Sequence, residues 1–150
     1  MNRRSEPRLD DQTLPRAEPF SWPIRVYYED TDSGGIVYYA NYLKFMERAR
    51  TEWLRALGFT QRELAEREGV VFVVRSLAIE YLRPSRFDDS LQVTVEPVKV
   101  GAGQIVVAQE VRRAAELLAS AEVRLACVNV ATLRPVRIPQ AVHIRTGTIS

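Results

Sequence analysis

The run from Asp30 to Gly35, DTDSGG, combines two carboxylates with two hydroxyls and two glycines, and an amphipathic segment follows it. This order suits attack on a carbonyl group. A helix beginning near Tyr39 would present unpaired N–H groups and a partial positive charge, which stabilise an oxyanion. The carboxylate of Asp32, seven residues earlier, could activate water or attack directly. An aspartate before a helix also commonly serves as a cap or an Asx turn, so the run alone permits both interpretations.

Other chemistries are excluded by what the sequence lacks. A calcium loop is rejected because glycine comes one place early and Asn41 stands at the twelfth position, where a bidentate Glu is needed. The single cysteine, Cys127, permits no internal disulfide and no cysteine-based zinc site. The single histidine, His143, excludes His-rich metal sites and most Ser-His-Asp schemes. No Walker loop, nucleophile elbow or dinucleotide fingerprint is present.

Length and charge place further bounds on the function. A chain of 150 residues with 46% hydrophobic content can fill the core of one domain. The net charge of +2 is too small to predict a nucleic-acid partner, while the pI near 8.9 permits an anionic ligand. No apolar run approaches the roughly 20 residues of a membrane span, and residues 1–11 do not resemble a secretory signal. We therefore expect a cytoplasmic protein.

The hydrophobic periodicity predicts the elements that carry this loop. An apolar stripe at steps of three or four predicts a helix from near Tyr39, with Phe45 and Trp53 in the core. A second, short helix is predicted to begin at a capping box formed by Thr60 and Glu63 and to end at Gly69. Strands are predicted over residues 24–28, 70–81, 91–96, 104–113 and 117–130. A strand, a long helix and then four strands predict an α+β fold with an antiparallel sheet.

The predicted domain occupies residues 21–138. Residues 1–20 are rich in charge and proline, which predicts a flexible leader, and residues 139–150 are predicted to form a surface tail that includes His143. Cys127 falls on an alternating strand and is predicted to be a small core residue.

A family resemblance sharpens these expectations. Residues 25–42, RVYYEDTDSGGIVYYANY, resemble the signature of the 4-hydroxybenzoyl-CoA thioesterase-like hotdog family. Residues 47–55, ERARTEWLR, resemble its branch of Tol–Pal-associated acyl-CoA thioesterases. The similarity resumes at FVVR, residues 72–75, and at YLRPSRFDD, residues 81–89, and extends over about residues 22–138.

The resemblance implies an acyl-CoA thioesterase with a hotdog fold, in which a sheet of about five strands wraps around one long helix. Asp32 matches the catalytic carboxylate, as nucleophile or general base, and Tyr39 matches the position whose backbone N–H polarises the thioester carbonyl. Dimers, often tetramers, with active sites at the dimer interface are implied, as is a peripheral link to the cell envelope. No metal or prosthetic group is expected, because CoA or acyl carrier protein enters as part of the substrate.

Two positions depart from the family pattern. Many members of the branch carry His where this chain has Tyr39. In aromatic-CoA members, basic residues clustered on the hairpin between the middle strands bind the CoA phosphates, and here that hairpin has only one basic residue, Lys99. Basic residues elsewhere could compensate, although each also fits a solvated charge at a strand end. The predicted substrate-binding residues are Gly35, Ile36, Val37, Arg75, Arg83 and Lys99.

One function of another class stays open. Hotdog domains also serve as non-catalytic binders, here a partner of a lipid-synthesis or envelope complex. Replacing Asp32 would leave such a binder unaffected, which separates the two hypotheses. A dehydratase is disfavoured because it would need a histidine beside its carboxylate, and His143 lies far along the chain.

Overall fold

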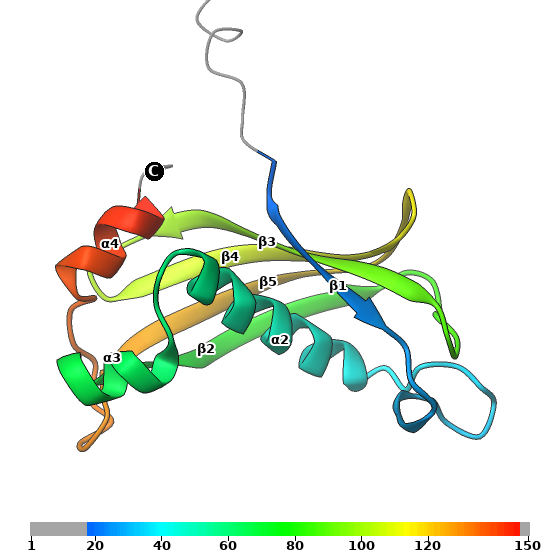
Figure 1. Cartoon of the computed structure of the whole chain (residues 1–150), viewed down its shortest axis with the longest axis horizontal. Helices are drawn as coiled ribbons and strands as arrows, with labels where there is room; N and C mark the ends of the chain where they lie inside the picture. The colour runs from blue at the N-terminus through cyan, green and yellow to red at the C-terminus, as the bar shows by residue number, and fades with distance from the viewer. Residues whose placement is uncertain (1–17, 148–150) are drawn as a thin grey trace, which may run out of the picture.

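The computed structural model describes residues 18–147. One five-stranded antiparallel sheet with the order β1-β3-β4-β5-β2 forms its centre (Figure 1). The strands are β1 Phe20–Arg25, β2 Val70–Tyr81, β3 Ser90–Val100, β4 Gln104–Arg113 and β5 Glu116–Asn129. Strands β3, β4 and β5 follow one another as neighbours, whereas β2 lies at one edge and β1 at the other.

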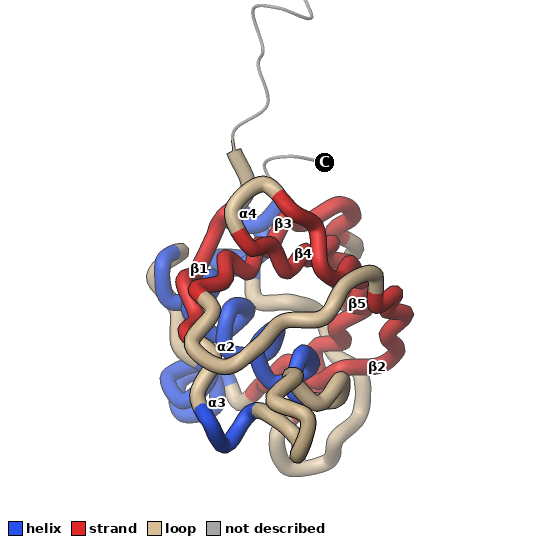
Figure 2. The backbone as a smooth tube through the Cα atoms, turned by 90° about the vertical axis from the view of Figure 1, so that its right-hand side faces the viewer, coloured by secondary structure: helices blue, strands red, loops and turns tan. Residues whose placement is uncertain are grey.

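The long helix α2, Asn41–Ala56, lies across one face of this sheet. Figure 2 shows the sheet curving around α2. The buried side chains of α2 recur at helical spacing: Tyr42, Phe45, Met46, Ala49, Trp53 and Leu54. They pack against inward-facing side chains of the sheet such as Val93, Val107 and Val123, which are fully buried. The α+β class and the hotdog arrangement are therefore confirmed, because one apolar helical stripe covers the apolar face of an alternating sheet.

Three shorter helical segments complete the fold: η1 Tyr28–Asp30, α3 Gln61–Glu68 and α4 Gln140–Thr146. The caps of α3 are as predicted, since Thr60 Oγ1 accepts the Glu63 N–H at 3.1 Å and Gly69 adopts φ +70°. No helix among residues 18–147 is long and apolar enough to cross a membrane.

The first strand lies earlier in the chain than its composition predicts. It ends at Arg25, and Tyr28 begins η1 instead of continuing the strand. The reason is local: the Asp30 carboxylate accepts the N–H of Tyr27 at 2.8 Å and closes a turn there. Of the predicted leader, residues 1–17 lie outside the described residues.

The predicted surface tail is wrong for part of its length. Residues 140–146 form α4, in which Val142 and Thr146 are buried, and Val142 belongs to the main core. Arg145 Nη1 donates to the Leu57 carbonyl at 2.6 Å, which fastens α4 to the end of α2. A helix of seven residues has too little local stability to be read from propensity, so packing against the domain decides it.

Candidate active site

Asp32 lies in a tight, exposed turn between η1 and α2. Its carboxylate Oδ1 accepts the Gly34 N–H at 2.9 Å, and its backbone N–H donates to the Ile36 carbonyl at 2.9 Å. Gly35 adopts φ +78°, a conformation that side chains with a Cβ rarely take. The carboxylate pairs with no cation within residues 18–147, so the Asx turn fixes its orientation while Oδ2 stays available for chemistry.

A second carboxylate, Asp30, holds this turn against α2. Asp30 is buried, and its backbone carbonyl accepts the Tyr38 N–H at 3.1 Å and the Asn41 side-chain amide at 2.8 Å. Its side chain is committed to the Tyr27 N–H. No local pattern in the sequence distinguishes the structural role of Asp30 from that of Asp32. The two aspartates differ in burial: Asp30 is buried and supports the loop, whereas Asp32 is exposed on it.

The start of α2 presents unpaired backbone donors. The helix begins at Asn41, two residues after the predicted start at Tyr39, because the preceding turn has i→i−3 bonds from Asn41 N–H to Tyr38 and from Tyr42 N–H to Tyr39. Within the described residues, the N–H groups of Tyr39 and Ala40 donate to no acceptor. Two free donors at a helix start can bind an oxyanion.

The Tyr39 ring belongs to an aromatic cluster in which Tyr38, Tyr39 and Tyr81 are exposed and Tyr42 is buried. Its centroid lies 4.8 Å from that of Tyr38 and 5.5 Å from that of Tyr81, which in turn lies 5.7 Å from Tyr42. Hydrogen bonding to Tyr39 and repulsion from it raise the pKa of Tyr38, while burial and then Tyr39 raise the pKa of Tyr81. Tyr38 and Tyr81 therefore stay neutral at physiological pH and offer the site aromatic surface rather than charge.

The structure gathers part of the predicted substrate-binding set beside Asp32. Gly35, Ile36 and Val37 continue directly from the turn, and Ile36 forms an antiparallel bridge with Arg86 in the segment after β2. Arg83 is the second residue of that same segment, and its Nε lies 3.4 Å from Glu116 Oε2.

The other two basic residues lie elsewhere in the fold. Arg75 is exposed at an irregularity in β2, where the register shifts between Val74 and Ser76. Lys99 is near the far end of β3, whose opposite end pairs Ser90 with Arg25. Nine residues of strand separate Ser90 from Lys99, about 30 Å at 3.3 Å per residue. Within one chain, Lys99 therefore does not reach the Asp32 turn.

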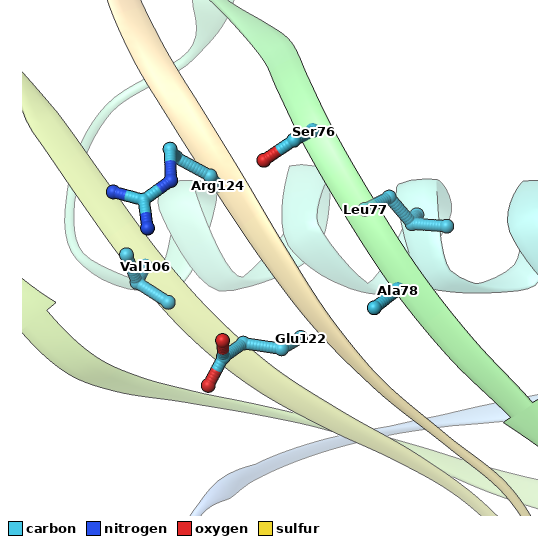
Figure 3. Close-up of a pocket in the computed structure, with 6 residues that line it drawn as sticks. All are labelled: Ser76, Leu77, Ala78, Val106, Glu122 and Arg124. Carbon is cyan, nitrogen blue, oxygen red and sulfur yellow. The ribbon is translucent and has the colours of Figure 1, made fainter.

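Four hollows in the described part of the chain offer binding space, and Asp32 lines none of them. One of about 360 Å³ is lined by β1 and by Asp30, beside the Asp32 turn. The groove of about 170 Å³ in Figure 3, formed by β2, β4 and β5, lies on the sheet face away from α2. A pocket of about 270 Å³ lies at the hairpin between β3 and β4, and Lys99 lines it. A cavity of about 400 Å³ opens between α2, α3 and β2, with Trp53, Phe72 and Val74 among its walls.

The 400 Å³ cavity also contains a partly desolvated cation. Burial lowers the pKa of Arg50, although the charge of Glu47 opposes this, and Arg50 Nη1 donates to Gln109 Oε1 at 2.9 Å. Gln109 is fully buried and donates to the carbonyl groups of Met46 and Thr94. Within residues 18–147, no three His, Cys, Asp or Glu side chains group closely enough to hold a metal ion.

Comparison with known proteins gives one consistent answer. Residues 26–145 match the family described as the thioesterase-like superfamily. The acyl-CoA thioesterase YbgC of Haemophilus influenzae is 48% identical over 123 residues, covering 82% of this chain and 90% of that protein. The acyl-CoA thioester hydrolase YbgC of Escherichia coli O6:H1 is 46% identical, covering 82% and 92%. A probable thioesterase from Bartonella henselae superposes with a TM-score of 0.78 at 34% identity, covering 81% and 100%.

These similarities confirm the resemblance seen in the sequence, including the branch of Tol–Pal-associated thioesterases to which the YbgC proteins belong. The match spans the Asp32 turn, the whole of α2 and all strands except β1. This chain is a member of the thioesterase-like superfamily with the hotdog fold.

Proposed function

We propose that this protein hydrolyses the thioester of acyl-CoA to a free acid and the CoA thiol. One observation carries the proposal: an exposed carboxylate fixed by an Asx turn and two unpartnered N–H groups at a helix start belong to the same loop, in a chain of a thioesterase family. The YbgC relatives, which are acyl-CoA thioesterases by name, support acyl-CoA as the substrate class.

In this mechanism, the N–H groups of Tyr39 and Ala40 hold the carbonyl oxygen of the thioester as negative charge develops on it. Asp32 acts by one of two balanced routes. As a base, it takes a proton from water, hydroxide adds to the carbonyl carbon, and the departing thiolate recovers the proton. As a nucleophile, Oδ2 displaces the thiolate to form a mixed anhydride. Water then hydrolyses the anhydride to the acid and free Asp32, and the remaining proton of that water goes to the thiolate.

A single turnover in ¹⁸O-labelled water separates general-base catalysis from a nucleophilic route in which water attacks the Asp32 carboxyl carbon of the anhydride, because that attack labels Asp32 and leaves the acid unlabelled. General-base catalysis places the label in the product acid at the first turnover. The nucleophilic route, with water attacking the acyl carbon of the anhydride, also labels the product, but an anhydride intermediate is trapped as a hydroxamate by hydroxylamine. Hydroxamate formation that depends on Asp32 supports the nucleophile.

We further propose that the working form is a homodimer. β2 is an edge strand, and Val73 and Val74 are exposed along it beside the 400 Å³ cavity. An unpaired edge with exposed valines favours pairing with another copy. Light scattering at micromolar concentration should give twice the chain mass of 17.1 kDa or a higher multiple. A 17 kDa particle would contradict the dimer.

The decisive test is a hydrolysis screen over acyl-CoA chain lengths, one aryl-CoA and an acyl carrier protein thioester, run beside Asp32→Ala. We expect turnover of at least one CoA thioester, and its loss in the variant. If every substrate reacts no faster with wild type than with Asp32→Ala, the catalytic proposal fails and a non-catalytic binding role takes its place.

A further inference from the structure

The segment between β2 and β3, residues 82–89, forms a platform under the active-site turn. Val37 N–H donates to the Ser85 carbonyl at 2.8 Å, and Phe87 N–H donates to the Gly35 carbonyl at 3.4 Å. Between these bonds, Ile36 bridges to Arg86. The residues that follow Asp32 are therefore held by this segment and not by the helix alone.

Ser85 connects the platform to α2 as well. Its side chain is fully buried, and its hydroxyl shares a hydrogen bond of 2.7 Å with the hydroxyl of Tyr42, which is also buried. The Tyr42 N–H in turn donates to the Tyr39 carbonyl at 3.2 Å. Ser85 thus contacts the Asp32 turn through its carbonyl and the first turn of α2 through its hydroxyl.

Hydrogen bonds within residues 82–89 and from Arg113 hold the platform in place. Asp89 Oδ2 accepts the Arg86 N–H at 2.8 Å and Arg113 Nη1 at 2.8 Å. Arg113 also donates to the Pro84 carbonyl at 3.3 Å and to Glu116 Oε1 at 2.6 Å. The arginine lies at the end of β4, so the β4–β5 hairpin fixes where Ser85 sits.

We propose that Ser85 is a positioning residue, which sets the distance between the Asp32 carboxylate and the N–H of Tyr39 through its paired contacts with Val37 and Tyr42. The proposal rests on the proposed function of that site. The reacting groups must stand about 3–3.5 Å from the substrate atoms, and a displacement of 1 Å can cost about 100-fold in rate. A buried hydroxyl pair is suited to this task because a satisfied hydrogen bond in the interior makes the packing around it rigid.

The test compares Ser85→Ala, Tyr42→Phe and the double variant. Each single change leaves one buried hydroxyl without its partner, so we expect lower Tm and a kcat reduced by about 10- to 100-fold. The double variant removes both hydroxyls, so its Tm should return toward wild type. Because the positioning bond is still absent, its kcat should stay at least about tenfold low, with KM unchanged.

Thr146→Val is the matched control. Thr146 is buried in α4, and its Oγ1 donates to the Val142 carbonyl at 2.9 Å, away from the Asp32 turn. This variant should lose Tm and keep its kcat. If the kcat of the double variant recovers together with its Tm, Ser85 is only structural and the proposal is overturned.

Amide hydrogen exchange gives a readout that needs no activity. In the wild type, the Val37 amide donates to the Ser85 carbonyl and the Asp32 amide donates to the Ile36 carbonyl. Both amides should exchange at least about tenfold faster in the double variant, and their exchange should be unchanged in Thr146→Val. Unchanged protection would overturn the proposal. A wild type that hydrolyses no thioester would contradict the proposed function separately, and exchange would still decide whether Ser85 holds the turn.

Discussion

Replacing Asp32 with Asn separates the charge of the carboxylate from its part in the turn. The Asn side chain keeps a carbonyl oxygen that can accept the Gly34 N–H, as Oδ1 does at 2.9 Å. The side chain is exposed and has no ion pair among the described residues, so unfolding free energy should change by no more than about 0.5 kcal/mol. Asp32→Ala removes the bond to Gly34 too and should cost about 0.5–1.5 kcal/mol.

The catalytic effect should be much larger than the effect on stability. Removing a positioned base or nucleophile lowers kcat by at least about 100-fold, equivalent to about 2.7 kcal/mol of transition-state stabilisation. Thermal unfolding followed by circular dichroism gives the stability. Release of the CoA thiol, detected with a thiol reagent at saturating acyl-CoA, gives kcat.

Two results would refute this reasoning. Turnover by folded Asp32→Asn within tenfold of wild type would mean that another group supplies the base or nucleophile. A loss of Tm in Asp32→Asn as large as in Asp32→Ala would mean that the Asx turn does not explain the geometry of the loop.

Three further outcomes are expected. Tyr39→Phe keeps the backbone N–H and should leave kcat nearly unchanged, whereas the kcat of Tyr39→Pro, once the variant is shown to be folded, should fall by about 10²- to 10³-fold. If Tyr39→Phe is inactive, the phenol takes part in the reaction. Gly35→Ala should lower the free energy of urea unfolding by about 1–2 kcal/mol through backbone strain, because Gly35 has a φ of +78°. No steric clash adds to this cost, since a Cβ at this position meets nothing within 4 Å. An unchanged urea midpoint would contradict this strain. Burial would raise the pKa of Asp89, but hydrogen bonds from the Arg86 N–H and from Arg113 outweigh burial and lower that pKa. Asp89 therefore stabilises the fold at neutral pH, and this stability is lost as the pH falls below about 4. The free energies of urea unfolding of wild type and Asp89→Asn should converge at that acidic pH, and a constant difference between them from pH 7 to pH 2 would refute the argument.

Local sequence pattern was sufficient for the main elements. The stripe of α2, the capping pair of α3 and the alternation of β3 to β5 are all signals of short range, which the chain expresses wherever an apolar face can be covered. Cys127 is buried as predicted, and burial raises its pKa to about 11. The family signature around Asp32 likewise needs only contiguous residues, and the comparisons confirm the family.

Tertiary structure decided which residues share a site. Asp30 and Asp32 have the same chemistry two places apart, and only contacts with Tyr27 and Asn41 make the first structural. The direction of β3 places Lys99 away from the Asp32 turn. The segment at Ser85 comes under that turn although 53 residues separate it from Asp32. Such placements follow from strand order and burial, which link residues distant in sequence, so no local pattern specifies them.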